Sequence, residues 1–486
     1  MKITKHFFTA LVAIVPTLFI ACNKVDYSAV EENTAELQIP SRERDVNVTP
    51  SEAATLAELF ANSSDGIAGI SSKAGTKHSS KISTTASVRE DGQDLMYVFN
   101  YEDGGWVIVG STREYYPILA YSDEGKFELQ DDMGPVDVWL DETKVSIKNC
   151  SRLSDEDKEQ MRSLWSHYED AGLLAETTKA SRVLTKSAGE DSCWNRIDSL
   201  QALYGSDGWT FTTVSAVEQL FTDLGLTSEY NSICYSATQN YSALNETIIG
   251  YQNPVVYVYG PFLNTQWKQG YPFNKLCPNH VSAGCAVIAA AQVMKYYEYP
   301  YILSWEGTPF TWADIPVAPS ANSKQPELIM AVAQACQIDY INVMGATPAD
   351  VADGLESLGY DTDYDSHNIT SVKNEIVNHS RPVLMYGVDT TTVNGVHMWV
   401  CDGVNDLRYN QVRYYTENQP NGAGVFTQGM YSFNNPGLVG NTNSYLSLHM
   451  NWGWSGSFDG WFASYNVNSG YGNYNYQRIN VYVSVP

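Results

Sequence analysis

The chain has 486 residues, which favours two or three domains, and 43% of them are apolar, which is enough for ordinary hydrophobic cores. It carries 29 Lys and Arg against 55 Asp and Glu, a formal net charge of -26 at pH 7. Nucleic-acid binding needs clustered basic residues, so this balance argues against nucleic acid as a partner and favours a soluble surface outside the cytoplasm.

The N-terminus has the pattern of an export signal. Two lysines precede an apolar core at residues 7–20, which is short for a transmembrane helix. The core ends at Ala21-Cys22, and a small residue before a cysteine here resembles the lipobox of bacterial lipoproteins. We predict that residues 1–22 are a lipoprotein signal peptide and that Cys22 is lipidated; the alternative is an ordinary signal peptide. The expected location is the cell envelope or cell surface, through a lipid anchor in the membrane, with release after processing as a further option.

Polar composition and apolar runs divide the first part of the chain. Residues 23–90 are polar and weakly patterned, which predicts a flexible tether interrupted by a helix at residues 52–60. Residues 91–176 are patterned as a folded α+β domain. Its predicted elements are three strands and an amphipathic helix, at residues 95–99, 105–109, 117–121 and 155–176.

A composition typical of a linker follows at residues 177–192, with basic residues available to proteases. Residues 193–254 favour a small helical insertion or N-terminal extension. From residue 255 to residue 486 the pattern predicts a single α+β domain, with a strand at 255–259 and helices at 326–336 and 348–358.

A thiol stands at the start of a predicted helix. Gly284-Cys285 opens an Ala-rich apolar run, residues 286–299, that stops at Pro300. The N–H groups and dipole of a helix N-terminus stabilise a thiolate, and the backbone N–H of Cys285 could donate to an oxyanion. Buried free cysteines are common, so Cys285 alone could equally be a small core residue.

Two later features complete a catalytic pattern. His397 lies in an otherwise apolar, strand-like stretch and could act as general base, although a single strand histidine is more often structural. Asn451-Trp452 could orient the imidazole and shield it from water; taken alone, this element could also be a core aromatic or a sugar-stacking turn. The order Cys, His, Asn/Trp is that of papain-like peptidases.

The remaining cysteines give no metal site. Six of the eight cysteines stay after Cys22 and Cys285 are assigned, and in an exported protein some of these could form disulfides. Because no Cys or His cluster has metal-ligand spacing, we predict neither a metal nor an organic cofactor.

The motifs together resemble the streptopain family of papain-like cysteine peptidases over roughly residues 255–486. The segments that carry the resemblance are Trp267-Lys268-Gln269-Gly270, Ala283-Gly284-Cys285-Ala286, Gly395-Val396-His397 and Asn451-Trp452-Gly453-Trp454. The strands predicted before residue 122 resemble the propeptide of that family. The resemblance implies a helical part carrying the Cys and an antiparallel β part carrying the His, preceded by an α+β propeptide domain.

The resemblance also implies roles for individual residues. Cys285 would be the nucleophile and His397 the base, with Trp452 packed beside the histidine and Asn451 as its candidate orienter. Gln269 is the candidate side-chain donor of the oxyanion hole, in competition with Gln266 and Asn279. The family's propeptide holds the enzyme as a zymogen, so cleavage is expected in the 177–192 linker or after the helical insertion.

Several positions depart from the family pattern. Ala283 replaces a Thr, and Val396 replaces a Gly directly before the histidine, where it could reshape the substrate cleft. We predict Val396 and Trp454 as substrate-binding residues. Residues 405–444 are a longer connection than expected and could form a lid, an extra hairpin or a partner surface.

The favoured prediction is a secreted, lipid-anchored cysteine endopeptidase acting on proteins or peptides, with its own propeptide as intramolecular inhibitor. An inactive relative serving as a binding lipoprotein is an alternative, although Cys285 and His397 are both present. A glycan-binding envelope lipoprotein is another, which leaves Gly-Cys at a helix start unexplained. A third is another papain-like enzyme, such as an acyltransferase of the transglutaminase type or a cell-wall peptide hydrolase, against which the propeptide-like strands argue.

Overall fold

The structure of the protein is a computed structural model that describes most of the chain from residue 45 onward. The described residues are 45–63, 80–180, 188–239, 244–341, 345–389, 395–420, 426–440, 444–464 and 478–486. The predicted signal peptide and Cys22 lie outside them.

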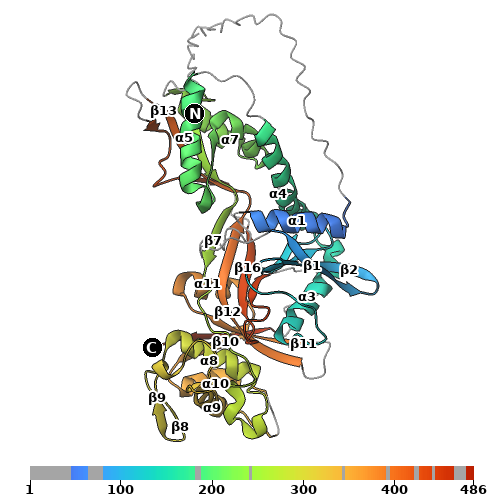
Figure 1. The fold of residues 1–486 in the computed structure, drawn as a ribbon, viewed down its shortest axis with the longest axis vertical. Coiled ribbons are helices and arrows are strands. Elements are labelled where there is room, and N and C mark those ends of the chain that lie inside the picture. Colours follow the sequence, from blue (N-terminus) through green and yellow to red (C-terminus); the bar gives the residue numbers. More distant parts are fainter. Residues whose placement is uncertain are drawn as a thin grey trace, which may run out of the picture. The chain divides into compact units, whose positions relative to one another are not determined.

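The N-terminal region (residues 45–180) packs helices onto antiparallel strands (Figure 1). Its elements are α1 (Pro50–Asn62), β1 (Ile82–Glu90), β2 (Gln93–Tyr101), β3 (Trp106–Gly110), β4 (Ile118–Ser122), α3 (Pro135–Asn149) and α4 (Asp155–Ala180). α1 starts at a capping box in which Thr49 and Glu52 satisfy each other's backbone N–H groups, and Pro50 stands at its first position. Its buried face, including Leu56 and Phe60, packs on the core beside β2 and β3.

The tether predicted for residues 23–90 is therefore wrong within the described residues 45–63 and 80–90. α1 is longer than the helix predicted at residues 52–60, and β1 pairs with β2 along its length. The sequence of β1 has no apolar alternation because it is an edge strand, exposed along most of its length.

The C-terminal region (residues 255–410 and 444–486) is α+β, as predicted. Its helices are α8 (Cys285–Tyr297), α9 (Gln325–Ala335), α10 (Pro348–Ser357) and α11 (Ile369–His379). Its strands are β7 (Val255–Tyr259), β8 (Leu303–Trp305), β9 (Thr308–Phe310), β10 (Asp361–Ser366), β11 (Val383–Asp389), β12 (Gly395–Arg408), β16 (Tyr445–Asn451), β17 (Gly460–Ala463) and β18 (Ile479–Ser484). Helices α8, α9 and α10 pack together, with α8 also against β12 (Figure 1).

One sheet runs through both regions. Among the described residues its order is β1-β2-β3-β4-β17-β16-β12-β11-β18-β10, with β7 paired to β12. The junction is the antiparallel pair β4 and β17, where Trp461 lies opposite Tyr121 and Phe462 opposite Ala120. Two hydrophobic cores contain side chains of both regions, so neither region buries these surfaces by itself.

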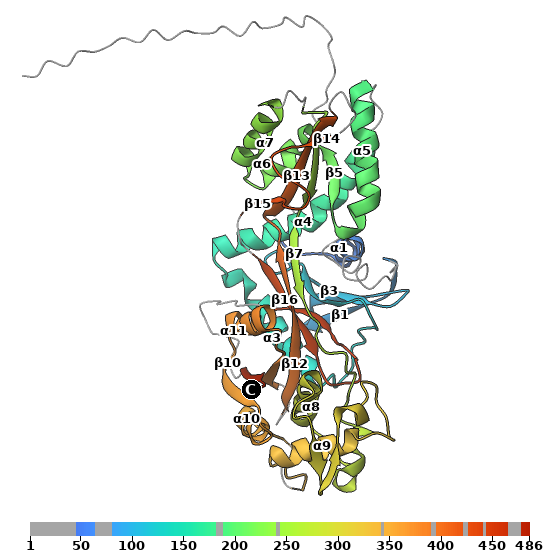
Figure 2. The same ribbon diagram turned by 90° about the vertical axis from the view of Figure 1, so that its left-hand side faces the viewer.

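A small module is built from two segments, residues 188–252 and 411–440. Its elements are α5 (Ala188–Tyr204), β5 (Thr210–Thr213), α6 (Glu218–Asp223), α7 (Thr227–Gln239), β6 (Ile248–Gln252), β13 (Gln411–Pro420), β14 (Phe426–Gln428) and β15 (Gly437–Gly440). β13 pairs with β6, and β6 pairs with β5. The strands next to them along the chain, β7 after β6 and β12 before β13, pair with each other in the large sheet (Figure 2). The predicted helical insertion and the long connection after the histidine strand are thus two halves of one mixed α/β unit.

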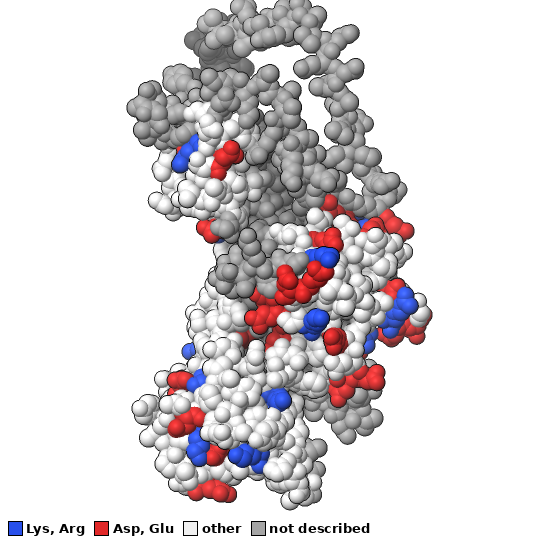
Figure 3. Space-filling model, viewed as in Figure 1, with Lys and Arg blue, Asp and Glu red and all other residues white. Residues whose placement is uncertain are grey.

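The boundary between the N-terminal region and the small module is narrower than the predicted linker. Helix α4 continues to Ala180 and α5 begins at Ala188, so both ends of the 177–192 stretch are helical. The surface drawn in Figure 3 carries acidic side chains with Lys and Arg scattered singly among them, in keeping with the negative net charge.

Candidate active site

Cys285 is the first residue of α8, as the sequence predicts. Gly284 precedes it with φ of 90°, a backbone conformation that glycine adopts without strain. Residues 286–294 of the helix are all buried, so α8 is a core helix whose N-terminus presents the half-buried thiol. The helix position and the glycine before it are the features that a nucleophilic cysteine requires.

The thiol is surrounded by main-chain donors. Burial raises the pKa of the Cys285 thiol, and the N–H groups of Met398, Ala286 and Cys285 itself act in the opposite direction without overcoming burial. The thiol is therefore neutral in this conformation near pH 7, and an additional positive charge is needed to form the thiolate.

Tyr386 and Met398 are site residues that sequence reasoning missed. They lie opposite each other in the pair of β11 and β12. Burial and the nearby Cys285 sulfur raise the pKa of Tyr386, so its phenol lies close enough to the thiol for the charges to interact. The clue available in the sequence was the position of Met398 directly after the candidate base.

His397 is half-buried in β12, opposite Gly387 of β11. Met398 belongs to the core formed with α8, whereas Trp399 belongs to the core shared with α3. Because side chains alternate between the two faces of a strand, His397 lies on the α3 face with Trp399. Consistent with this, a Cβ on Gly387 would lie 2.8 Å from Val138 Cγ1 of α3 and 3.0 Å from the Trp399 ring.

Asn451, the last residue of β16, is buried against α8. Its Nδ2 donates to the Thr265 carbonyl at 2.8 Å, and its Oδ1 accepts from Gln292 Nε2 at 3.0 Å and from Gly453 N at 3.2 Å. Thr265 Oγ1 in turn donates to Gln292 Oε1 at 2.7 Å. The carboxamide thus fixes the Cys helix against the sheet, and the expected contact with His397 stays a prediction.

Trp452 lies on the same face of the sheet as Trp399. The two rings are 5.1 Å apart between centroids, and the indole N–H of Trp452 donates to the Phe458 carbonyl at 3.0 Å. Only 1% of Trp452 is exposed, so it can exclude water from the strand that carries His397.

Gln269 lies beside the turn that precedes Cys285. Its Oε1 accepts from Ser282 Oγ at 2.9 Å, and its carbonyl accepts from Ala283 N at 2.9 Å. These bonds orient the carboxamide NH₂ group, the donor that an oxyanion hole needs. Gln266 and Asn279 are the other two candidates for this donor. Gln266 packs against Gly456, and Asn279 has a positive backbone φ of 51°.

The two predicted substrate contacts differ in exposure. Val396 is 37% exposed at the start of β12. Trp454 is half-buried and forms an isolated β-bridge with Lys268, the residue before Gln269. Segments 265–270, 282–285 and 451–454 meet around α8 through these contacts, whereas His397 lies on the opposite, α3 face of β12.

An imidazole–carboxylate pair outside the predicted site lies at the junction of the regions. His449 Nδ1 is 2.6 Å from Asp402 Oδ1, and Asp402 Oδ2 accepts from Leu263 N. Burial opposes a charge on His449, but Asp402 outweighs it and raises the pKa of the imidazole. Burial also raises the pKa of the neighbouring Asp459 to about 7. Asp402 is fully buried and bound to the backbone, which suits a structural pair.

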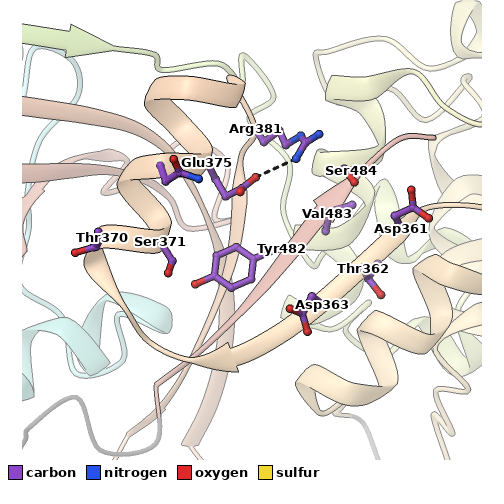
Figure 4. A pocket seen from close by; sticks show the side chains of 11 residues that line it. Asp361, Thr362, Asp363, Thr370, Ser371, Glu375, Arg381, Tyr482, Val483 and Ser484 are labelled. Atoms are coloured by element: carbon purple, nitrogen blue, oxygen red, sulfur yellow. Dashed lines mark hydrogen bonds and ion pairs between the residues drawn. The ribbon is translucent and has the colours of Figure 1, made fainter.

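The groove drawn in Figure 4 contains none of the predicted site residues. It is lined by polar side chains of β10, α11 and β18, with an ion pair of 3.4 Å between Arg381 and Glu375 at its rim. Among the described residues, no group of His, Cys, Asp and Glu could hold a metal ion, and no helix is long and apolar enough to cross a membrane. Cys150, Cys234, Cys277, Cys336 and Cys401 are free thiols like Cys285, so the disulfides left open by the sequence do not involve them.

Two family models match the chain. Residues 45–147 match the model described as Spi protease inhibitor, and residues 267–462 match the Peptidase C10 family. A solved structure of a fragment of prointerpain A from Prevotella intermedia is 15% identical and covers 82% of this chain and 97% of its own, with a TM-score of 0.42. No curated protein matches. The family matches confirm the resemblance to the streptopain family and the order of an inhibitory N-terminal domain before a peptidase domain.

Proposed function

Because residues 267–462 belong to the peptidase C10 family and follow an inhibitor domain of the Spi type, we propose that this chain is a cysteine endopeptidase made as a zymogen. The observation that carries the proposal is Cys285 at the N-terminus of a buried helix, with main-chain N–H groups around its sulfur. Proteins or peptides are the substrates, and no cofactor is needed for this chemistry.

The proposed reaction passes through an acyl-enzyme. His397 takes the proton of the Cys285 thiol, and the thiolate attacks the carbonyl carbon of a peptide bond. The Cys285 N–H and the Gln269 carboxamide stabilise the oxyanion. The C–N bond then breaks as His397 gives its proton to the leaving amine, and a water activated by the same imidazole hydrolyses the thioester.

Latency is proposed to come from the N-terminal region. Helix α3 covers the face of β12 on which His397 lies, whereas the Cys285 thiol is on the α8 side. Burial keeps the thiol neutral, and an imidazolium beside it would lower its pKa. Removal of the N-terminal region would therefore permit the start of β12 to rearrange so that the imidazole reaches the thiol.

Strand pairing favours retention of the small module in the mature enzyme. β5 pairs with β6, and β6 pairs with β13, which follows the histidine strand in the chain. Cleavage after β6 would leave residues 188–252 attached through these hydrogen bonds, so we propose that the activating cut falls before α5. Export and lipidation at Cys22 remain part of the proposal on sequence grounds alone.

The test is intact-mass spectrometry of the chain from Asn23 onward, incubated with reductant and with or without an irreversible thiol-directed peptidase inhibitor. We expect conversion to a fragment starting before α5, blocked by one inhibitor adduct on Cys285. Cys285→Ala should abolish conversion, whereas Cys234→Ala, a half-buried thiol of the small module, should convert as wild type does.

The outcomes separate the alternatives. Self-conversion of Cys285→Ala would contradict the assignment of the nucleophile. If the chain shows no conversion and no adduct, the result would favour an inactive relative. An adduct without conversion would indicate a competent thiol that needs another peptidase for activation.

A further inference from the structure

Trp454 stands beside the residues that surround the nucleophile. Its backbone forms a β-bridge with Lys268, and Ser455 N donates to the Trp267 carbonyl at 2.9 Å. The preceding Gly453 is so close to α8 that a Cβ on it would lie 3.2 Å from Ile288 Cγ2. The main chain around Trp454 is therefore fixed next to the first turn of the Cys helix and to the segment that carries Gln269.

The backbone of the N-terminal region lies directly on this indole. Gly134, the N-cap of α3, has a φ of 61°. A Cβ on Gly134 would overlap the ring of Trp454, 2.8 Å from Cη2 and closer still to Cζ2 and Cε2. Only a residue without a side chain fits against the ring here, so the contact is between main chain and indole.

The turn before α3 is held in place by its own hydrogen bonds. Gly134 N donates to Asp132 Oδ1 at 3.0 Å, and Met133 N donates to Asp137 Oδ2 at 2.8 Å. Met133 is 2% exposed in the core that both regions share. These contacts make the turn a rigid element that presents the Gly134 backbone to the ring.

The indole N–H of Trp454 is buried and, among the described residues, has no hydrogen-bond acceptor. Buried indole N–H groups normally have a partner. A donor left unpaired beside a main-chain segment can be satisfied in another state by a peptide carbonyl, which is the acceptor that every substrate backbone carries.

We propose that the indole of Trp454 is a platform for polypeptide backbone, covered by Gly134 in the zymogen and by a substrate residue in the mature enzyme. The substrate residue on the platform is Gly, because a Cβ in the place of Gly134 would overlap the ring, and its neighbouring carbonyl accepts from Trp454 Nε1. The proposal rests on the proposed peptidase function and adds a selectivity for Gly at one subsite.

The first test compares two glycines of the N-terminal region. Gly134→Ala introduces a Cβ against the ring, whereas Gly125→Ala also places Ala at a positive φ, 68°, and has nothing within 4 Å of its Cβ. In the full chain, Gly134→Ala should convert to the mature form roughly tenfold faster than Gly125→Ala, because overpacking weakens a tight contact. The measurement is the half-time of conversion, with the melting temperature of both variants recorded to separate a general loss of folding.

The second test uses the mature enzyme and a mixture of peptides cleaved and sequenced by mass spectrometry. We expect Gly to be enriched at one fixed position relative to the cut. Trp454→Ala should remove this enrichment, and Trp454→Phe should keep it while raising KM, because Phe retains a ring but has no N–H donor.

The outcomes distinguish this inference from the function on which it rests. A wild-type chain without peptidase activity would contradict the proposed function. An active enzyme in which Gly134→Ala and Gly125→Ala convert equally fast, or in which no position selects Gly, would contradict the platform alone. If Gly134→Ala does not fold, the peptide profile of the mature Trp454 variants decides.

Discussion

The N-terminal region is joined to the C-terminal region by strand pairing and the small module by the continuous chain, and the two bury their apolar surfaces differently. Two of the cores containing side chains of the N-terminal region also contain side chains of the C-terminal region. The two cores of the small module are made from its own residues. A region that shares its cores cannot leave without exposing apolar surface, whereas a region with its own cores can keep its fold on a single ribbon.

This difference has a consequence for activation. After the connecting chain is cut, the N-terminal region still contributes β4 to the sheet and α3 to the shared core. Cleavage alone should therefore leave an inhibited complex, and full activity requires dissociation or further proteolysis of the N-terminal region. The small module needs no such step, because its strands pair with β13 of the mature chain.

The largest effect is expected at the shared core. Trp139 of α3 is 3% exposed and packs edge-on against Phe462 of β17, with ring centroids 4.9 Å apart. Trp139→Ala should cost about 3–5 kcal/mol, as for other buried aromatic truncations, and should weaken the docking of the N-terminal region. The expected result is peptidase activity in the uncut chain, measured with a fluorogenic peptide before conversion begins.

Phe221→Ala is the matched control in the small module. Phe221 is fully buried, with Tyr414 as an aromatic neighbour at 6.0 Å, so the cost in unfolding free energy should be similar, about 3–5 kcal/mol. The loss should be confined to the module, as a separate early transition in calorimetry, while latency is kept. Equal loss of latency in both variants would contradict the contrast between shared and separate cores.

A smaller effect is expected at a hydrogen bond that crosses the junction. Asn405 Nδ2 of β12 donates to the Tyr121 hydroxyl of β4 at 2.6 Å, and both residues are buried. Tyr121→Phe leaves this amide donor without that acceptor, which should cost about 1–3 kcal/mol and loosen the N-terminal region. The readout is the urea midpoint together with the half-time of conversion.

Tyr101→Phe separates this effect from a general loss of stability. The Tyr101 hydroxyl donates to the Ala57 carbonyl at 2.8 Å, within the N-terminal region. This variant should lower the urea midpoint to a similar extent. If it also speeds conversion as much as Tyr121→Phe, the hydrogen bond at the junction has no special part in latency.

Local patterns predicted the elements around Cys285 but not the partners of those elements. The Ala-rich run after Gly284 indicated a buried helix, and the observed α8 begins at Cys285 and ends before Pro300. The apolar runs before residue 122 likewise became strands β2, β3 and β4. These predictions succeeded because period and composition are properties of neighbouring residues.

Pairings between distant segments could not be predicted in the same way. Nothing in the composition of β4 indicates that it adds to β17, and residues 188–252 give no sign that their strands need β13. The hydrogen-bond partners of Asn451 could not be predicted either, because a buried amide can bond to a helix residue, as it does to Gln292, or to a histidine. The face on which His397 lies also became clear only from the cores on either side of β12.

The smallest expected effect is a pH dependence at the same junction. His449 faces Asp402 and is also influenced by Asp459 and by Asp123 of the N-terminal region. Burial raises the pKa of Asp459 to about 7 from an ordinary 3.8, so its contribution to stability is complete below about pH 4 and is lost as the pH rises toward 7. The raised pKa of His449 has the same sign, since its contribution is complete below pH 6.5 and is lost as the pH rises through the higher folded value.

The uncut chain should therefore be more stable at pH 5 than at pH 8, by at most about 1.4 kcal/mol for each pH unit and titrating proton. Urea unfolding of the Cys285→Ala chain, which avoids self-cleavage, measures this difference. Asp459→Asn keeps an oxygen that can accept from the backbone N–H of Trp452, which donates to Asp459 Oδ1 at 2.9 Å in the parent chain. The substitution also removes the titrating carboxyl group. The variant should show a flatter pH profile and gain stability mainly at pH 8, because the buried charge is absent there. A profile as steep as that of the parent chain would assign the pH dependence to groups other than Asp459.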